Sequence, residues 1–468
     1  MAAGRSSKLR GVLPVILAVL LLVLGFVGVA VTRQVLAARA VHPIRVPPPS
    51  APAADAAAAL STGAPTRPAT GANAPAPTAA GVTAALATPL TAPALGPAVS
   101  AQVLDGPTGA VLYARRADAL VAPASTSKLL TAAAVLTVHR PTDRFTTRVL
   151  AGPTPGSVVL VGGGDPTLSA APAGQPTRYP EAGRISELAE QVRTALGGAP
   201  VTRVLVDGSL FTGPAVEPSW APEDSPSSYG CPITAAMVDG GRDQPDAVIL
   251  SATPDLAAGR ALASALGGAA VSRGSAPPGA RQLGAERSAP VGVLVEQMLR
   301  NSDNIIAEVL GRQVALAEHL AASFAGAAAA VRTVLGRLGV QAGTGMRDAS
   351  GLSARDRLPA DAMVRVLRMA TGPDHPEFRS IASGLSVAGW DGSLVEQNRF
   401  TGAAAVGDGV VRAKTGSLTG VSNLAGLLTD RDGRQLIFLF VADRAPTEGP
   451  TRDAIDRLVT ALVGCGCR

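Results

Sequence analysis

The sequence predicts an α/β domain whose antiparallel sheet is assembled from strands at both ends of the folded region, with a β-rich domain inserted between them. Short apolar strand patterns separated by turn residues occur after residue 98 and again after residue 410. Between them, residues 290–337 show a helical pattern of apolar side chains, whereas residues 148–288 contain short apolar runs and turns rich in Gly and Pro. We therefore expect helices to flank the main sheet and the insertion to fold separately.

The N-terminal part of the chain differs in composition from the rest. Residues 11–32 are uncharged and mostly apolar, and their length is about what a helix needs to cross a bilayer. Residues 1–10 carry three basic side chains, and positive charge favours a cytoplasmic location for the segment that precedes a membrane helix. We predict a cytoplasmic tail, a single-pass transmembrane anchor in the cell membrane and an extracytoplasmic location for the remainder. Secretion after cleavage of a signal peptide is the alternative.

Residues 33–97 are dominated by Pro and Ala and contain few large apolar side chains. Such a segment cannot bury enough surface to fold, and its prolines keep it extended. We therefore predict a disordered linker that holds the folded region away from the membrane.

Turn residues and periodicity place the elements of the predicted sheet domain. Two apolar runs flank residues 105–109, Asp-Gly-Pro-Thr-Gly, and this pattern is typical of a β-hairpin. An apolar helix follows, with Ser125 at its start and Lys128 in its first turn. Towards the C-terminus we expect a strand, a hairpin and an amphipathic helix at residues 410–414, 424–441 and 451–463.

Composition narrows the range of functions. The net charge is +6, but the basic residues form no cluster with interleaved aromatic residues, so no nucleic acid partner is predicted. The four histidines are scattered and no Cys-x-x-Cys pair occurs, so we expect neither a metal site nor a cofactor. The three cysteines suit an oxidising compartment, and we expect one disulfide between Cys231 and either Cys465 or Cys467.

The segment Ser125-Thr126-Ser127-Lys128 is the first of three motifs that carry chemistry. A serine and a lysine three residues apart at the start of a helix lie on one face, so the amine can reach the hydroxyl. A buried lysine near another cation can lose its proton and act as a base. The N–H groups at a helix start also favour negative charge on the serine oxygen. We therefore predict that Ser125 is a nucleophile and that Lys128 is its base.

Two further motifs follow in the sequence. Ser302-Asp303-Asn304 interrupts the helical pattern and is predicted to present a hydroxyl and an amide from a tight loop. Lys414-Thr415-Gly416-Ser417 ends a predicted strand, where Gly416 permits close approach of a substrate backbone and Lys414 supplies positive charge. Only three of the 41 basic side chains are lysines, and two of them are Lys128 and Lys414. Because arginine is a poor general base, this choice of lysine indicates a chemical role.

The three motifs, in this order, resemble the S-x-x-K, S-x-N and K-T-G motifs of the serine penicillin-binding protein and β-lactamase superfamily. Within that superfamily, residues 98–468 resemble the DacB-type D-alanyl-D-alanine carboxypeptidases/endopeptidases, the class C low-molecular-mass penicillin-binding proteins. The long gap between Lys128 and Ser302 resembles the inserted domains of that class. The segments that carry the resemblance are residues 123–128, 162–168, 229–232, 348–353, 387–394 and 414–417.

The resemblance implies the β-lactamase/D,D-peptidase fold, with an antiparallel sheet flanked by helices. The penicillin-binding D,D-peptidase domain would comprise residues 98–147 and 289–468, and the inserted β-rich domain would comprise residues 148–288. One inserted domain is expected rather than two, because the gap is shorter than in the larger members of the class.

The resemblance also implies a mechanism and a substrate class. Ser125 would attack the carbonyl group between two D-alanines, or that of a D-alanyl-meso-diaminopimelyl cross-link, in peptidoglycan stem peptides, and Lys128 would accept its proton. Ser302 would pass a proton to the leaving amine, while Asn304 orients the substrate backbone. β-Lactams would bind covalently as inhibitors because they mimic the substrate. The residues that would hold the substrate and its carboxylate are Lys414, Thr415, Gly416 and Ser417.

In the resembled family, an acidic and an aromatic residue around the Y-G-x-P segment bind the free amine of a diaminopimelate side chain. Asp224 and Tyr229 match that spacing, with Trp220 nearby, so the resemblance implies that they form this pocket. Two alternatives to a D,D-peptidase remain open: a β-lactamase-like hydrolase, and a catalytically silent peptidoglycan-binding protein that keeps the fold. The intact set of motif residues argues against the silent protein, because a scaffold has no need of a deprotonatable lysine.

Overall fold

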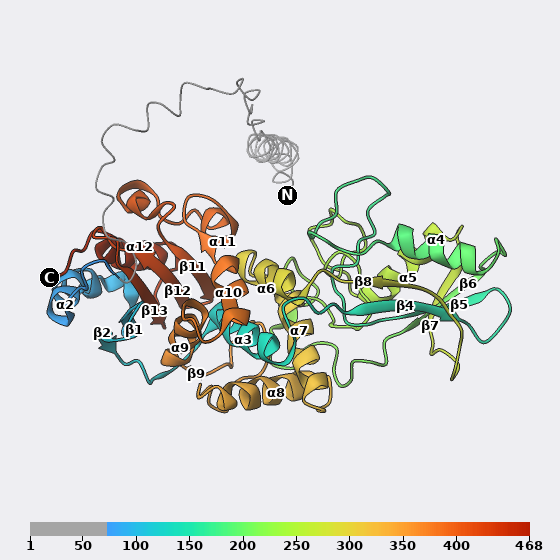
Figure 1. The fold of residues 1–468 in the computed structure, drawn as a ribbon, viewed down its shortest axis with the longest axis horizontal. Helices are drawn as coiled ribbons and strands as arrows, with labels where there is room; N and C mark the ends of the chain where they lie inside the picture. Colours follow the sequence, from blue (N-terminus) through green and yellow to red (C-terminus); the bar gives the residue numbers. More distant parts are fainter. Residues whose placement is uncertain (1–72) are drawn as a thin grey trace, which may run out of the picture. The chain divides into compact units, whose positions relative to one another are not determined.

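The computed structural model describes residues 73–468 (Figure 1). The predicted cytoplasmic tail and transmembrane anchor, residues 1–32, lie outside the described residues, as does most of the predicted linker. Within residues 73–468, no helix combines the length and the apolar character that crossing a bilayer requires.

The prediction of a disordered linker over residues 33–97 is wrong for its C-terminal part. Helix α2, Ala79–Ala87, lies in this part and is followed by two 3₁₀ turns. Val82 and Leu86 from α2, together with Leu95, are buried in the same apolar cluster as the C-terminal helix. A few apolar residues suffice to order this segment because the surface they pack against comes from the other end of the chain, which local composition does not reveal.

The described residues form a six-stranded antiparallel sheet that joins the two ends of the folded region (Figure 1). The strand order is β10-β11-β12-β13-β1-β2, and β1 pairs with β13 along its whole length. The prediction of an antiparallel sheet built from both ends is therefore confirmed. The strands are β1 (Ala98–Asp105), β2 (Val111–Arg115), β10 (Ser386–Val387), β11 (Arg412–Leu418), β12 (Val421–Thr429) and β13 (Gln435–Asp443).

Helices cover both faces of this sheet. Successive residues of β13 point to opposite faces, so that Phe438 and Phe440 pack with α2 and with α12 (Glu448–Val463), whereas Ile437 and Leu439 pack with the helices of the other face. Because both faces are buried, the strand is a continuous apolar run in the sequence. The helices that pack on the same face as Ile437 and Leu439 are α3 (Lys128–Val138), α6 (Val291–Arg300), α7 (Asn304–Ala317), α8 (Phe324–Arg337), α9 (Ala360–Thr371) and α10 (Arg379–Gly384).

Residues 146–287 form a second, mixed sheet with the strand order β7-β6-β5-β4-β8. Strands β5, β6 and β7 are parallel, and helices α4 (Ile185–Ala195) and α5 (Pro254–Ala265) connect them (Figure 1). The segment expected to be β-rich is therefore mixed α/β, because parallel neighbours need crossover connections. The strands are β4 (Thr146–Ala151), β5 (Ser157–Val161), β6 (Arg203–Asp207), β7 (Ala270–Arg273) and β8 (Gln282–Arg287), and a separate short pair is β3 (Leu120–Val121) with β9 (Leu358–Pro359).

The expected disulfide between Cys231 and the C-terminus is wrong. Cys465 and Cys467 are joined to each other, and Cys231 is a free, buried thiol. Cys231 packs in an apolar cluster with Trp220, whereas the Cys467 carbonyl oxygen accepts a hydrogen bond from the Thr78 N–H at 2.7 Å, beside α2. The number and spacing of cysteines could not show that the two sites belong to different parts of the fold.

Candidate active site

Ser125 lies in a 3₁₀ turn, Ala124–Ser127, that leads directly into α3. The sequence analysis placed Ser125 at the start of the helix, whereas α3 begins one short turn later, at Lys128. The Lys128 amine donates a hydrogen bond to the Ser125 hydroxyl, with Nζ and Oγ 2.9 Å apart. Lys128 is fully buried while Ser125 is partly exposed. The pair therefore presents a hydroxyl on the accessible side with an amine behind it.

Two other acceptors hold the Lys128 amine in place. Nζ donates to Asn304 Oδ1 at 2.5 Å and to the Ser350 carbonyl oxygen at 2.7 Å. Burial lowers the pKa of Lys128 from 10.5 to about 8, and the charges of Asp348 and Glu308 oppose this shift without cancelling it. The neutral amine, which can take a proton from the serine hydroxyl, is therefore accessible near neutral pH.

The second motif lies in the turn between α6 and α7. Ser302 has a φ of 55°, in the left-handed region, and this turn lets Asp303 cap α7 by accepting a backbone hydrogen bond at 3.0 Å. Asn304, the first residue of α7, donates from Nδ2 to the Tyr229 carbonyl oxygen at 3.0 Å. One amide side chain therefore contacts Lys128 through its oxygen and the Tyr229 segment through its nitrogen.

Lys414 lies inside β11, whereas the sequence placed its motif at the end of a strand. Its Nζ donates to Ser302 Oγ at 2.9 Å and to the Thr415 carbonyl oxygen at 2.8 Å. Burial, with the nearby charge of Lys128, lowers the pKa of Lys414 well below its usual value. Each buried lysine thus contacts one motif serine: Lys128 contacts Ser125, and Lys414 contacts Ser302.

Gly416 brings β11 close to the turn that carries Ser125. A Cβ atom at this position would lie 3.0 Å from the Pro123 carbonyl oxygen and 3.2 Å from the Cβ of Asn423. Asn423, in β12, also donates from Nδ2 to the Pro123 carbonyl oxygen at 2.8 Å. These contacts set the spacing between the strand and the nucleophile, so a larger side chain at position 416 would crowd the turn.

Thr415 and Ser417, both in β11, have different surroundings. Thr415 is buried, and its hydroxyl donates to Ser393 Oγ at 2.8 Å. Ser417 is partly exposed, and Nη2 of Arg452 lies 3.4 Å from its hydroxyl oxygen. Ser417 is therefore the better placed of the two to meet a substrate. Arg452 is a nearby cation that the sequence analysis did not single out, because its position in the C-terminal helix gave no sign of this neighbour.

Asp224 and Tyr229 lie side by side, and the Tyr229 hydroxyl donates to Asp224 Oδ1 at 3.1 Å. Partial burial of the hydroxyl and its hydrogen bond to Asp224 raise the pKa of Tyr229. Trp220 is instead buried and donates from Nε1 to Asp348 Oδ2 at 2.7 Å. The structure therefore brings Asp224 and Tyr229 together beside Asn304, whereas the indole of Trp220 faces inward.

The loop of residues 348–353 is part of the site, although the sequence analysis used it only as a mark of the resemblance and assigned it no role. The Asp348 carboxylate accepts hydrogen bonds from two N–H groups of the loop at 2.6 and 2.7 Å, and Glu308 accepts one from the Ser350 N–H at 2.9 Å. These bonds shape the loop so that its carbonyl oxygen at Ser350 faces Lys128. A signal was present, because Glu308 and Arg312 are charged residues in a mostly apolar helical stretch, and both are fully buried.

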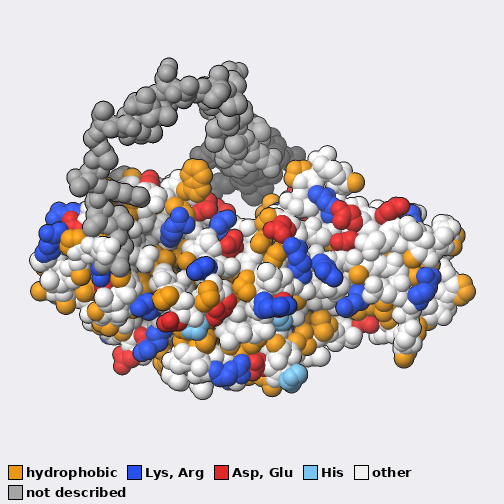
Figure 2. Space-filling view, in the orientation of Figure 1, with side chains coloured by type: hydrophobic (Ala, Val, Ile, Leu, Met, Phe, Trp, Pro, Cys, Tyr) orange, Lys and Arg blue, Asp and Glu red, His pale blue; other side chains and the backbone are white. Residues whose placement is uncertain are grey.

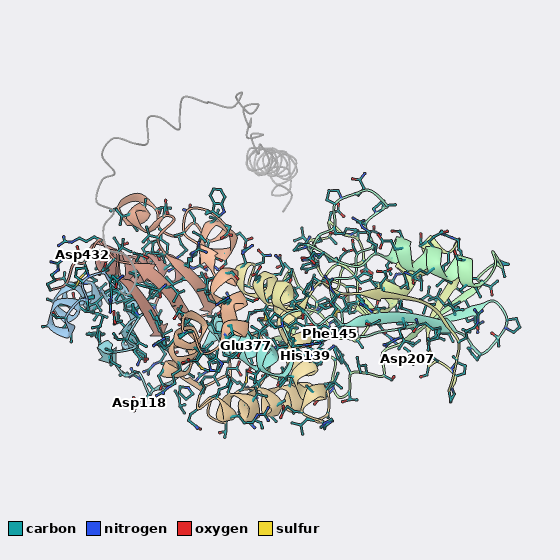
Figure 3. All side chains as sticks on the ribbon, in the orientation of Figure 1. Asp118, His139, Phe145, Asp207, Glu377 and Asp432 are labelled. Carbon is teal, nitrogen blue, oxygen red and sulfur yellow. A yellow bond between two sulfur atoms is a disulfide. The ribbon has the colours of Figure 1, made fainter. Side chains whose placement is uncertain are left out.

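The histidine at the end of α3 lies away from this cluster. His139 packs edge-on against Phe145, with 5.5 Å between ring centroids (Figure 3). It follows an eleven-residue helix that begins at Lys128, and such a helix is about 16 Å long. His139 is therefore too far from the nucleophile to act as its base.

Comparison with known proteins identifies the family. The sequence matches the D-Ala-D-Ala carboxypeptidase 3 (S13) family over residues 82–251 and 245–462. The chain belongs to this family. It is 46% identical over 378 residues to a carboxypeptidase of Mycobacterium tuberculosis, which covers 79% of this chain and 81% of that protein. It is 43% identical over 389 residues to carboxypeptidase DacB of Mycolicibacterium smegmatis, which covers 81% of this chain and 83% of that protein.

Among solved structures, the fold is similar to that of penicillin-binding protein 4 from Haemophilus influenzae. The TM-score is 0.66 at 20% identity, and the match covers 80% of this chain and 99% of that chain. A second structure of that protein is a complex with a β-lactam. The predicted membership in the DacB-type carboxypeptidases is confirmed, and with it the prediction of a serine-type D,D-peptidase with a mixed α/β fold.

Proposed function

We propose that this chain releases D-alanine from peptidoglycan stem peptides, and opens the cross-links between them, through an acyl-enzyme on Ser125. The contact between Lys128 and Ser125 is the main support. A buried amine with a pKa of about 8 lies 2.9 Å from a partly exposed hydroxyl oxygen. A serine hydroxyl is a weak nucleophile until a neighbouring base takes its proton. The two mycobacterial relatives are named carboxypeptidases, in agreement with this reaction.

In the acylation step, Ser125 Oγ attacks the carbonyl carbon of the D-alanine that precedes the scissile bond, and Lys128 takes the hydroxyl proton. Asn304 and Ser350 hold the amine in position while its charge changes. The N–H groups of Ser125 and Ser417 bind the developing oxyanion, and each donor in comparable sites contributes about 10²–10³-fold to the rate.

The leaving amine then needs a proton. Ser302 is partly exposed and contacts the Lys414 amine, so it gives its hydroxyl proton to the leaving amine and takes in return the proton that Lys128 accepted from Ser125. Lys414 and Ser417 hold the substrate carboxylate, whose arrival favours the charged form of Lys414 and offsets the effect of burial. Thr415 stabilises this strand on its buried side, and Gly416 leaves room for the substrate backbone because it has no side chain. Water then attacks the ester and releases the shortened peptide.

β-Lactams enter the same acylation step and remain bound to Ser125. The Haemophilus influenzae protein has been solved as a β-lactam complex, which supports this part of the proposal. Incubation of the full chain with a fluorescent penicillin, followed by intact mass and peptide mapping, should find a stable adduct on Ser125 that is absent in Ser125→Ala. Rapid hydrolysis without an adduct would indicate a β-lactamase instead. Neither an adduct nor hydrolysis by folded protein would indicate a silent peptidoglycan-binding protein.

Asp224 and Tyr229 receive the free amine of a diaminopimelate side chain. The carboxylate of Asp224 lies at the surface next to the phenol, within the segment that Asn304 contacts. Asp224→Ala should slow the hydrolysis of stem peptides that carry the amine, compared with peptides in which the amine is acetylated. Equal slowing of both substrates would remove the support for this pocket.

The organisation of the chain fits a wall enzyme. Residues 98–147 and 289–468, with α2 packed against their C-terminal helix, form the penicillin-binding domain. Residues 148–288 form the inserted domain, and residues 11–32 anchor the chain in the membrane with its catalytic part outside the cytoplasm. The composition of residues 11–32 and the second sheet of residues 146–287 support this arrangement. Fractionation of cells that express the full chain should find it intact in the membrane. A shortened form in the medium would indicate signal cleavage instead.

A further inference from the structure

A cleft of about 520 Å³ opens beside Ser302; the mechanism above uses Ser302, Asn304 and Tyr229 from its lining but assigns no ligand to the rest of it. It is lined by residues 301–305, by Arg178 and Arg242 from the inserted segment, and by Glu396 at the end of α11 (Gly392–Glu396). On the face that Figure 2 shows, basic side chains gather over the region between α6 and β8, with acidic side chains among them. The cleft thus lies where the inserted segment meets the catalytic motifs.

The position of the cleft relates it to the leaving group. Ser302, the proposed proton donor to the leaving amine, lines it, whereas the nucleophile and its base lie outside its lining. Glu396, another lining residue, adjoins Gln397, whose Nε2 donates to Thr415 Oγ1 at 3.3 Å in the strand that holds the substrate carboxylate. The cleft therefore extends from the side on which the leaving group departs.

Two arginines give one wall of the cleft positive charge and unused donors. Arg242 is buried and directs Nε and Nη1 to the carbonyl oxygens of Ala247 and Asp239, at 2.9 and 2.8 Å. Its Nη2 makes no hydrogen bond within the part of the chain that the structure describes. Arg178 is exposed and is bonded through Nη1 to the Pro245 carbonyl oxygen at 3.2 Å. Guanidinium groups with free N–H donors are suited to a carboxylate.

The nearby carboxylates are hydrogen-bonded to other groups. Asp303 lines the cleft, but its oxygens already accept hydrogen bonds from the Tyr179 hydroxyl at 2.8 Å and from the backbone of α7 at 3.0 Å. Asp239 is buried and accepts a backbone hydrogen bond at 2.9 Å; burial raises its pKa, and the charges of Arg178 and Arg242 oppose this shift without cancelling it. Among residues 73–468, neither Arg178 nor Arg242 forms an ion pair. The guanidinium groups therefore keep N–H donors for a ligand.

Exposed apolar side chains line the cleft or lie next to a lining residue in the sequence. Leu250 lines it, and the two residues before it, Val248 and Ile249, are 72% and 59% exposed. Tyr229, on the same side, is 47% exposed. Large apolar side chains that gather at the surface mark a place that another chain covers. Together with the free guanidinium donors, they indicate a ligand that is an acidic peptide rather than a small anion.

We propose that this cleft binds the second stem peptide of a cross-linked substrate, with Arg178 and Arg242 holding a carboxylate of that peptide. The inference rests on the proposed function, because it gives the larger leaving group a place to bind. A single D-alanine would leave the cleft empty, whereas a stem peptide joined through a diaminopimelate amine brings both carboxylates and methyl groups into it. The cleft therefore favours the opening of cross-links over the release of D-alanine.

The test compares kcat/KM for a cross-linked muropeptide dimer with kcat/KM for an uncross-linked pentapeptide monomer. Arg178→Gln should lower the dimer-to-monomer ratio about five- to tenfold, because one charge-assisted hydrogen bond to the dimer is lost. Arg178→Glu should lower the ratio further, since it repels the carboxylate. Arg203→Gln, which changes an exposed arginine of β6 outside the cleft, is the matched control and should keep the wild-type ratio.

A second control changes the substrate. A dimer whose free carboxylates are converted to carboxamides should give the same ratio with the wild-type enzyme and with Arg178→Gln. An unchanged ratio for Arg178→Gln with the free acid, or a fall that persists with the amidated dimer, would overturn the proposal. Acylation of Ser125 by fluorescent penicillin, measured on the same preparations, reports separately on the proposed function, because its absence in the wild-type enzyme would contradict that function whatever the ratio.

Discussion

The pH dependence of Ser125 acylation tests the role of Lys128, which must be neutral to accept the hydroxyl proton. Burial lowers the pKa of Lys128 from 10.5 to about 8. At about 1.4 kcal/mol per pKa unit, the free energy needed to deprotonate the amine at pH 7 falls from about 5 to about 1 kcal/mol. The acylation rate constant should therefore rise about tenfold per pH unit below pH 8 and level off above it. A lysine with an ordinary pKa would make the rate rise to beyond pH 10.

The matched perturbation is Glu308→Gln. Burial raises the pKa of Glu308, and its carboxylate in the charged form interacts with Lys128. That charge stabilises the ammonium form of Lys128, and its removal should move the midpoint of the pH profile to lower pH. The glutamine carbonyl oxygen can still accept the loop hydrogen bonds at 2.9 and 3.1 Å, so the loop should keep its shape.

The assay is stopped-flow acylation by a fluorescent penicillin under pseudo-first-order conditions, between pH 5.5 and pH 10. A thermal melt of each protein at each pH controls for unfolding. A wild-type rate that continues to rise beyond pH 9, or a Glu308→Gln midpoint that moves to higher pH, would refute this account of the base.

Three further changes test buried contacts at the site and elsewhere in the fold. Gly351→Ala should abolish acylation and lower the thermal midpoint, because its Cβ would overlap the Ala124 carbonyl oxygen; an active variant would contradict this. Asp456→Ala should lower the free energy of unfolding in urea by about 3–5 kcal/mol, because the buried Arg399 guanidinium loses its bidentate partner. A loss below about 1 kcal/mol would mean that water replaces the pair. Burial raises the pKa of Asp165 from 3.8 to about 6, so its stabilising contribution is complete below pH 3.8 and is lost as the pH rises through 6. Asp165→Asn should therefore gain up to about 3 kcal/mol over wild type between pH 4 and pH 8, and a constant difference would contradict this.

Local patterns in the sequence predicted a large part of the fold. The hairpin of β1 and β2 follows from turn residues between two apolar runs, and the break between α6 and α7 follows from three polar residues in a helical pattern. The contact of Ser125 with Lys128 follows from their spacing of three residues at a helix start. Each of these depends on residues that are close in the sequence, so that backbone geometry alone brings them together.

Other features depend on packing between distant segments, and the sequence analysis missed them. Residues 79–87 form a helix because the C-terminal helix covers their apolar side chains. Cys231 is unpaired because it is buried in a different cluster from the C-terminal cysteines. The Ser350 carbonyl oxygen reaches Lys128 across 222 positions of sequence. No local pattern predicts such a contact, because it exists only when both segments are in place.

The sequence by itself determined which residues could do the chemistry. It supplied a serine and a lysine on one helical face, and it kept lysine at two motif positions in a chain whose other basic residues are almost all arginine. The tertiary structure alone decided that these groups are reactive. Burial by α7, β11 and the loop of residues 348–353 removes water from the Lys128 amine and lowers its pKa to about 8. The pKa of an amine depends on its solvation and on nearby charges, and here both come from segments far apart in the sequence.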